Sequence, residues 1–251
     1  MIQNSSYFTD KTIVITGAGT GYGRALAITL LSYGANVILL GRRKEKLQET
    51  IRLSNNQNKA LPLECDISSI DNIQNIKQKI LNIYNSIDIL INCAAIAPDN
   101  DASLSVISEQ RWDKMMNINL KAQWLISKEL FSIMNNNIVR ILFFTSGAGW
   151  NDANGVGLYN ISKAALNSLT ISMAKEYEIN NPDKIISINA INPESAKTEM
   201  NTESNISAFE ICDMVFKILS TKENIPNGKF FRRNGKYVSF CNTLEYEYEL
   251  K

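Results

Sequence analysis

The sequence predicts a single α/β domain of the doubly wound Rossmann type, with about seven parallel strands and helices on both faces of the sheet. Short, β-branched, apolar runs such as Thr12–Thr16 and Ile138–Phe144 suit strands that are buried on both faces. Between such runs lie longer segments with helical apolar spacing, and this strict alternation is typical of a parallel sheet. No repeat, linker or low-complexity tract divides residues 1–251, so one domain is expected.

The expected elements alternate along the whole chain. Gly34 should stop the first helix, Ser108 should cap the long one, and Asn234-Gly235 predicts a hairpin within Lys229–Phe240. Strands are expected at Thr12–Thr16, Asn36–Leu40, Ala60–Cys65, Ile87–Ile91, Ile138–Phe144 and Ile185–Ile191. Helices are expected at Arg24–Tyr33, Lys44–Leu53, Ile70–Tyr84, Trp112–Met134, Tyr159–Tyr177 and Ala208–Leu219.

The composition excludes several classes of function. A net charge of +1 with no basic face predicts no nucleic-acid partner, and no apolar run approaches the ~20 residues of a membrane span. The chain has no histidine and four scattered cysteines, so no metal site and no Ser-His or Cys-His nucleophile is expected. Met1–Asp10 has neither the basic start nor the apolar core of a signal peptide. We therefore expect a cytoplasmic protein with free thiols.

Tyr159 and Lys163 form the pair with the clearest chemical meaning. They are four residues apart in a small-residue segment, so a helix places both side chains on one face. A neighbouring ammonium stabilises a phenolate, and lowering a phenol pKa from ~10 to near neutrality requires roughly 3–4 kcal/mol. On spacing alone, the commoner explanation is a tyrosine that packs on a lysine stem.

A glycine-rich loop follows the first strand and precedes the first helix. Its glycines are Gly17, Gly19, Gly21 and Gly23. Glycines allow the backbone to approach a pyrophosphate closely, and the helix N-terminus favours its negative charge. The G-x-G-x-x-G fingerprint is not matched, because Tyr22 stands where its third glycine belongs. A tight turn without a ligand is the alternative for such a loop.

The end of the second strand bears on the choice of cofactor. An NAD site usually offers a carboxylate to the ribose diol, whereas an arginine accommodates the 2′-phosphate of NADP. Here Arg42 and Arg43 follow the strand, with no carboxylate before Glu45. NADP(H) is therefore expected rather than NAD(H), although a solvated helix start would show the same charges.

These motifs, in this order on these elements, resemble the short-chain dehydrogenase/reductase family in its compact single-domain branch. The resemblance runs from about Lys11 to Thr198, and more loosely to Gly235. The family's T-G-x-x-x-G-x-G loop is matched by Thr16-Gly17, Gly21 and Gly23. The other matches are Asp66, Asn92-Cys93-Ala94-Ala95 for N-N-A-G, Asn119 within Trp112–Leu120, Ser146 thirteen residues before Tyr159, the Tyr159 and Lys163 pair, and Pro193-Glu194 with Thr198 for Pro-Gly-x-x-x-Thr.

The resemblance implies an NADP(H)-dependent oxidoreductase that interconverts a ketone and a secondary alcohol. It implies that Tyr159 moves the proton and that Lys163 lowers the phenol pKa and holds the nicotinamide ribose. It also implies that Ser146 polarises the substrate oxygen and that Asn119 holds a water. By the same resemblance, the cofactor-binding residues are Gly17, Gly19, Thr20, Gly21, Tyr22, Gly23, Arg42, Asp66, Ile67, Asn92, Ala94, Tyr159, Lys163, Pro193 and Thr198. A homodimer or homotetramer is implied, with contacts through the helices Trp112–Met134 and Tyr159–Tyr177.

Three residues depart from the family pattern: Tyr22 replaces a small aliphatic residue, Ala95 a glycine, and Glu194 the glycine of Pro-Gly. If that last glycine needs a positive φ, glutamate costs about 1 kcal/mol or more there. A carboxylate at this place could instead bind a basic or hydroxylated substrate.

Substrate identity is not visible in the sequence. Met200–Ser207 is a short, polar counterpart of the family's substrate lid, and Trp150–Asp152 and Ala97–Asp101 are expected to shape the pocket. Two other classes remain possible on the same fold. One is a regulator that binds NADP(H) without turnover, and the other is a scaffold that retains a fossil site.

Overall fold

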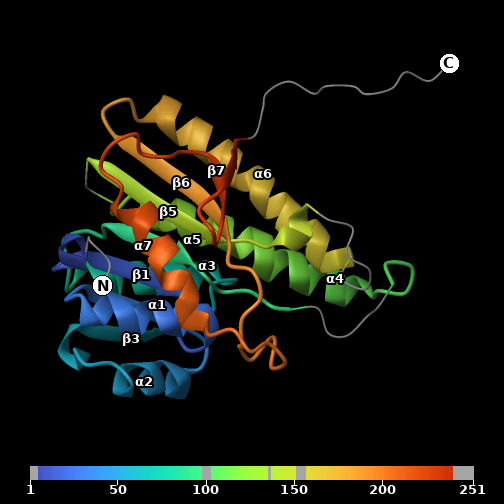
Figure 1. Ribbon diagram of the computed structural model, residues 1–251, viewed down its shortest axis with the longest axis horizontal. Coiled ribbons are helices and arrows are strands. Elements are labelled where there is room, and N and C mark those ends of the chain that lie inside the picture. The colour runs from blue at the N-terminus through green and yellow to red at the C-terminus, as the bar shows by residue number, and fades with distance from the viewer. Residues whose placement is uncertain (1–4, 98–102, 135–136, 151–156, 240–251) are drawn as a thin grey trace.

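A single eight-stranded sheet organises the protein. The computed structural model describes residues 5–97, 103–134, 137–150 and 157–239. The strand order is β3-β2-β1-β4-β5-β6-β7-β8, with seven parallel strands and β8 antiparallel to β7 (Figure 1). The strands are β1 Thr12–Thr16, β2 Asn36–Gly41, β3 Ala60–Glu64, β4 Ile89–Asn92, β5 Ile138–Phe144, β6 Ile185–Asn192, β7 Lys229–Arg232 and β8 Tyr237–Ser239. The expected parallel sheet is confirmed, and the hairpin adds an eighth strand to it.

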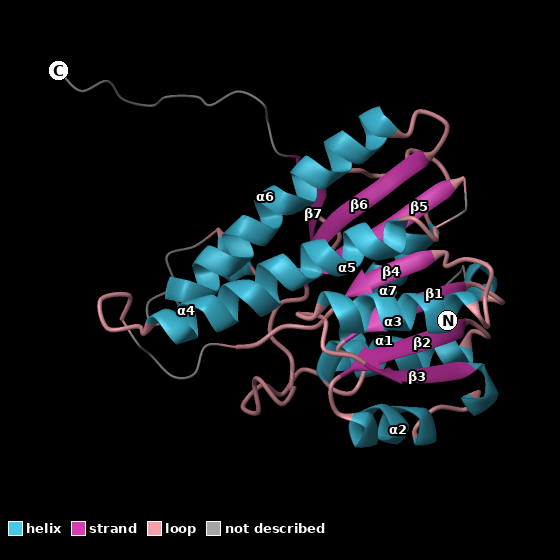
Figure 2. Ribbon diagram, turned by 180° about the vertical axis from the view of Figure 1, so that it is seen from behind, coloured by secondary structure: helices cyan, strands magenta, loops and turns pink. Residues whose placement is uncertain are grey.

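Helices cover both faces of the sheet. In Figure 2, α3, α5 and α6 lie over one face, while α1 and α7 lie over the other. None of the helices that the structure describes is long and apolar enough to cross a membrane. The helices are α1 Gly21–Ser32, α2 Lys44–Arg52, α3 Ile70–Leu81, α4 Glu109–Met116, α5 Ala122–Phe131, α6 Gly157–Asn180 and α7 Cys212–Ser220. Short helical turns lie at Ser5–Phe8, Gln57–Lys59, Asn117–Lys121, Gly147–Gly149 and Ala208–Ile211.

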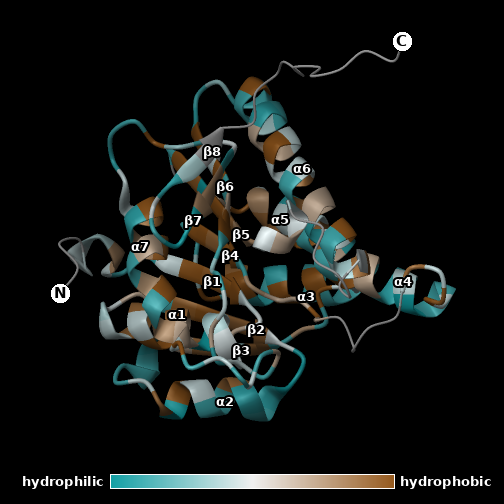
Figure 3. Cartoon of the chain, turned by 45° about the vertical axis from the view of Figure 1, so that its right-hand side comes forward, coloured by the Kyte–Doolittle hydropathy of each residue, from teal (hydrophilic) through white to brown (hydrophobic). Residues whose placement is uncertain are grey.

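The sheet is apolar on both faces, which explains why its strands show no alternation in sequence. Along β1, Ile13 and Ile15 join the core under α1 and α7, while Val14 joins the core under α3, α5 and α6. Figure 3 shows the brown, hydrophobic strands enclosed by helices with hydrophilic outer faces. Burial of apolar surface at roughly 25 cal/mol per Å² therefore stabilises both layers at once.

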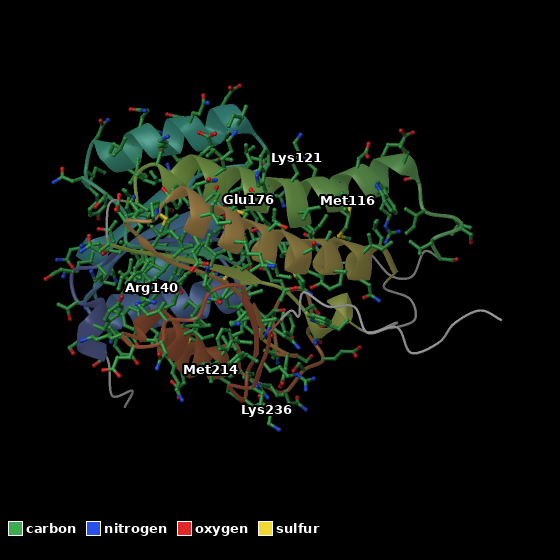
Figure 4. The ribbon with its side chains drawn as sticks, turned by 90° about the horizontal axis from the view of Figure 1, so that it is seen from above. Met116, Lys121, Arg140, Glu176, Met214 and Lys236 are labelled. Atoms are coloured by element: carbon green, nitrogen blue, oxygen red, sulfur yellow. The ribbon has the colours of Figure 1, made fainter. Side chains whose placement is uncertain are left out.

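The long helix expected at Trp112–Met134 is interrupted. Between α4 and α5 the chain forms a π-helical turn at Asn117–Lys121, and Figure 4 labels Met116 just before it and Lys121 at its end. The expected cap is confirmed, since the Ser108 hydroxyl accepts a hydrogen bond from the backbone N–H of Arg111. Such turns often mark functional sites, because they redirect a side chain that a regular helix would place elsewhere.

The expected hairpin is confirmed at the C-terminal edge of the sheet. Gly235 has a φ of +83°, and the Asn234 side chain accepts a hydrogen bond of 3.0 Å from the backbone N–H of Lys236. The turn packs on α7, because a Cβ at Gly235 would lie 2.8 Å from the terminal carbon of Met214. Figure 4 shows Met214 and Lys236 on the same side of the molecule.

Candidate active site

The expected site residues gather at the carboxyl edge of the sheet. Because all these strands are parallel, the segments that follow β1, β4, β5 and β6 emerge on the same edge. The strand order reverses between β1 and β4, and ligands of doubly wound sheets bind outside such a reversal. The first turns of α6 bring Tyr159 and Lys163 to this edge, beside Ser146 at the end of β5.

Ser146, Tyr159 and Lys163 form one connected group. The Ser146 hydroxyl hydrogen-bonds to the Tyr159 phenol. The Lys163 ammonium lies 5.5 Å from the centroid of the Tyr159 ring and donates a hydrogen bond of 2.9 Å to the backbone carbonyl of Phe144. Lys163 is almost completely buried. The structure thus places an ammonium, a phenol and a hydroxyl within one small volume.

Burial controls the protonation of this group. It lowers the pKa of Lys163 from its ordinary 10.5 to about 8, and the Cys93 thiol opposes the shift. Burial also raises the pKa of Tyr159, although the Ser146 hydrogen bond acts in the opposite direction. The net shift of the phenol pKa is therefore upward in this structure, and the lowering of that pKa by Lys163 stays a prediction. The ammonium lies over the ring and bonds to a backbone carbonyl, so burial of the phenol prevails.

Asn119 is held rigidly inside the π-helical turn. Its side-chain oxygen accepts a hydrogen bond of 2.8 Å from the backbone N–H of Ile96, and its amide group donates one of 3.0 Å to the carbonyl of Ile96. A further contact of 3.3 Å reaches the hydroxyl of Ser162 on α6. The side chain therefore joins the segment after β4 to the helix that carries Tyr159 and Lys163.

The glycine loop has the form of an anion-binding turn. Gly17 has a φ of +68°, and a Cβ there would lie 2.9 Å from the Cα of Ala94. Gly21 also has a positive φ, of +52°. Thr20 precedes α1 but makes no side-chain cap, so the first N–H groups of this twelve-residue helix are left for an anion. These features fit the pyrophosphate of a dinucleotide.

The residues after β3 and β2 lie at the other end of this edge. Asp66 accepts hydrogen bonds from the backbone N–H and the hydroxyl of Ser68, at 3.0 and 2.7 Å. Burial raises the pKa of Asp66, but these bonds and the positive charge of Arg42 outweigh burial and lower it overall. Asp66 is thus an ionised acceptor near an exposed guanidinium. The Ile67 side chain packs in the core, which leaves only its backbone to contact a cofactor.

The segment after β4 is fixed by side chains from α5. Ala94 donates its N–H to the Thr16 hydroxyl at 3.0 Å, and its carbonyl accepts a bond of 2.6 Å from the Gln123 amide. The Asn92 amide donates to the Ser127 hydroxyl at 2.9 Å. Gln123 is not among the site residues expected from the sequence, where its only signal is its place one helical turn after Asn119. Asn92 and Ala94 therefore shape the loop that faces the glycines.

The segment after β6 lies against the glycine loop. The Tyr22 hydroxyl donates a hydrogen bond of 2.7 Å to the carbonyl of Glu194, which follows the buried Pro193. A Cβ at Gly21 would lie 3.1 Å from the Thr198 side chain. Pro193 and Thr198 thus lie beside the glycine loop, and the sequence predicts that both contact the same cofactor as that loop.

Some of the expected pocket residues can be placed. The half-exposed Trp150 ring packs edge-on against Phe230 of β7, with centroids 5.1 Å apart. Asn151 and Asp152, and residues 98–101, lie outside the described residues, as does the tail from residue 240. Arg233, which is not among the residues expected from the sequence, pairs with Glu194 and Glu210, at 3.3 Å each.

This fold and the residues at this edge of the sheet are typical of nucleotide-binding proteins, and comparison with known proteins identifies the family. Residues 11–208 match the sequence profile of the family described as short chain dehydrogenase. The chain belongs to this family, whose members are oxidoreductases that use NAD(P).

Two relatives illustrate the similarity. The chain is 32% identical over 200 residues to the NAD-dependent glycerol dehydrogenase of Listeria innocua, in an alignment that covers 78% of this chain and 74% of the relative. It is 27% identical over 201 residues to the human mitochondrial dehydrogenase/reductase SDR family member 2, in an alignment that covers 80% of this chain and 70% of the relative.

Solved structures agree with the fold. A short chain dehydrogenase of Shigella flexneri, crystallised in complex with NADP, superposes with a TM-score of 0.83 at 24% identity over 92% of this chain and 100% of the other. One from Escherichia coli, in complex with NADPH, gives 0.83 at 23% identity over 92% and 99% of the two chains.

Proposed function

We propose that this protein is an NADP(H)-dependent oxidoreductase that interconverts a ketone and a secondary alcohol. The observation that carries the proposal is the connected group of Ser146, Tyr159 and Lys163, which lies on the same sheet edge as the glycine loop. A hydroxyl that can hold a carbonyl oxygen, a phenol that can move a proton and a buried cation suit this reaction.

In the reduction direction, each of these three side chains has a task. Ser146 holds the substrate oxygen, and Tyr159 donates the proton to it, since a phenol with a raised pKa keeps its proton at neutral pH. Lys163 stabilises the phenolate that is left, because a buried ammonium interacts strongly with a nearby anion. When bound, the nicotinamide supplies the hydride.

NADP(H) is proposed as the cofactor because the exposed segment after β2 offers Arg42 and Arg43 to a 2′-phosphate. The glycine loop and Asp66 would hold the pyrophosphate and the adenine, with Asn92, Ala94, Pro193 and Thr198 lining the rest of the cleft. Two structural neighbours were crystallised with NADP or NADPH, whereas the Listeria innocua relative is NAD-dependent. The arginines favour NADP(H) over NAD(H).

The test begins with cofactor binding. We would measure NADPH and NADH binding by quenching of tryptophan fluorescence, in the wild type and in Arg42→Ala. Tight NADPH binding that Arg42→Ala weakens supports the cofactor assignment. Absence of binding for either nucleotide contradicts an oxidoreductase and favours a scaffold.

Turnover is then tested on a panel of ketones and secondary alcohols, with Tyr159→Phe as the control. Loss of the proton donor should lower kcat by about 10²- to 10⁴-fold and leave the Kd for NADPH nearly unchanged. Cofactor binding without turnover of any compound would instead favour a regulator that senses NADP(H).

We further propose a cytoplasmic homodimer or homotetramer that associates through α4, α5 and α6. Trp112 on α4 and Trp124 on α5 expose 40% and 38% of their surface, which is high for residues this apolar. Sedimentation of the wild type and of Trp124→Glu tests this, since a charge at the contact should shift the assembly toward monomers.

A further inference from the structure

A carboxylate from the segment after β6 reaches the cations that follow β2. One oxygen of Glu199 lies 2.6 Å from the Arg43 guanidinium, and the other lies 3.7 Å from the Lys46 ammonium. Glu199 and Arg43 are 156 positions apart in the chain. Neither strand pairing nor helix spacing explains this contact, so it reflects how the segment after β6 lies against the segment after β2.

Arg43 and Lys46 lie where the proposed function places the adenosine end of a dinucleotide. Arg43 is the residue just before α2, and Lys46 lies in the first turn of that helix. Lys46 packs against the glycine loop, since a Cβ added at Gly19 would lie 2.9 Å from the Cβ of Lys46. In NADP enzymes of this fold, arginine at this place accommodates the 2′-phosphate of the ribose.

Glu199 is the carboxylate that forms an ion pair with Arg43. Lys46 has a second carboxylate partner in Glu49, at 3.2 Å, and Glu49 also binds Arg24 at 2.8 Å. Among the ion pairs of the described residues, Arg43 pairs with Glu199 alone. An anion that binds Arg43 must therefore displace Glu199 or share the guanidinium with it.

The turn that carries Glu199 lies over the glycine loop. Thr198 and Asn201 exchange backbone hydrogen bonds of 2.9 and 3.2 Å, so Glu199 occupies a corner of a tight turn. The Thr198 side chain would be 3.1 Å from a Cβ at Gly21. The ion pair thus connects a turn above the pyrophosphate-binding loop to the helix beside it.

We propose that Glu199 is a cofactor-specificity residue whose carboxylate holds the place on Arg43 and Lys46 that the 2′-phosphate of NADP(H) takes. This inference rests on the proposed function. A nucleotide with a 2′-phosphate breaks the ion pair between Glu199 and Arg43 and so releases the turn that carries Glu199. A nucleotide without a 2′-phosphate leaves the ion pair and the turn unchanged. Glu199 and Arg43 are about half exposed, at 48% and 53%, so the pair is weak enough for a phosphate to replace it.

The test uses two adenosine fragments, 2′,5′-ADP and 5′-AMP, whose binding is measured by isothermal titration calorimetry. Glu199→Gln should raise the affinity for 2′,5′-ADP by about three- to tenfold, because it removes the ion pair that competes for Arg43 and a negative charge that repels the phosphate. Binding of 5′-AMP should change by less than about twofold, and the gain should shrink at about 0.5 M salt. Glutamine keeps the length of the side chain, so the turn is preserved.

Two further variants show whether the effect passes through Arg43. Glu203→Gln removes a charge from the same segment but from a residue without an ion pair in the described ranges, and it should leave both affinities unchanged. Arg43→Gln should weaken the binding of 2′,5′-ADP. When Glu199→Gln is added to Arg43→Gln, the affinity should rise by less than when Glu199→Gln is made in the wild type, because the two residues are coupled.

The outcomes separate this inference from the function on which it rests. If 5′-AMP binds but Glu199→Gln leaves 2′,5′-ADP unchanged, or tightens both fragments equally, the role of Glu199 is wrong and the oxidoreductase stands. If neither the wild type nor Glu199→Gln binds any nucleotide, the proposed function fails and the role of Glu199 fails with it.

Discussion

The hydroxyl of Tyr22 donates a hydrogen bond of 2.7 Å to the backbone carbonyl of Glu194, across 172 positions of the chain. Both residues depart from the family pattern, and the structure shows that the departures contact each other. Glu194 adopts a φ of +59°, the left-handed conformation that glycine adopts without strain. Its carboxylate also pairs with Arg233, at 3.3 Å. The glutamate thus adds backbone strain and one ion pair, while the bond from Tyr22 goes to a backbone carbonyl that glycine would also offer.

Replacing Glu194 by glycine should stabilise the protein. Glu194→Gly relieves a left-handed conformation worth about 1 kcal/mol, while the ion pair with Arg233, which is partly exposed, offsets only a few tenths. Glu194→Ala loses the same pair but keeps the strain, so its free energy of unfolding should equal that of the wild type or fall slightly. Urea denaturation measures both variants, and equal shifts would show that the backbone is not strained.

A methyl group at Gly17 should be far more harmful than one at Gly34. Both glycines have a positive φ, +68° and +79°, so alanine costs each about 1 kcal/mol in backbone strain. At Gly34 the nearest atom would be 3.7 Å away, in the Thr9 side chain, whereas at Gly17 it is the backbone of Ala94 at 2.9 Å. Gly17→Ala should therefore lose a further 1–3 kcal/mol and bind NADPH poorly.

Thermal or urea unfolding of the two glycine variants, with an NADPH titration, checks this difference. Similar losses in both would mean that strain alone matters and that the loops after β1 and β4 can separate to admit a methyl group.

The buried ammonium of Lys163 should make stability rise with pH. Its pKa is about 8 in the folded protein and an ordinary 10.5 in the unfolded chain, so between these values only the unfolded chain holds the proton. The free energy of unfolding therefore increases with pH in this window, by up to about 3 kcal/mol. Below pH 8 both states are protonated and the contribution is constant.

Other groups also titrate in this range, so the measurement is a difference between the wild type and Lys163→Met. Urea denaturation on both sides of pH 8 should show the wild type gaining stability relative to the variant as the pH rises. A difference that does not vary with pH would mean that the folded protein keeps the lysine charged up to its ordinary pKa.

Local sequence patterns predicted most of the fold. β1 at Thr12–Thr16 and β5 at Ile138–Phe144 lie where the apolar runs placed them, because a strand that is buried on both faces needs an unbroken apolar run. The helical spacing of Tyr159 and Lys163 likewise predicted that they share a face of α6. Each of these depends only on residues a few positions apart, which is the range over which a helix or strand is regular.

Contacts between distant segments, and the effects of burial, could be read only from the three-dimensional arrangement. The π-helical turn carries Asn119, whose side chain makes two hydrogen bonds with Ile96, and no apolar period encodes it. The raised pKa of Tyr159 reflects burial by surrounding elements, which outweighs the opposing hydrogen bond with Ser146. The Glu199–Arg43 pair depends on where two loops end at one edge of the sheet. Local periodicity carries no information on such distances, because packing of the whole chain sets them.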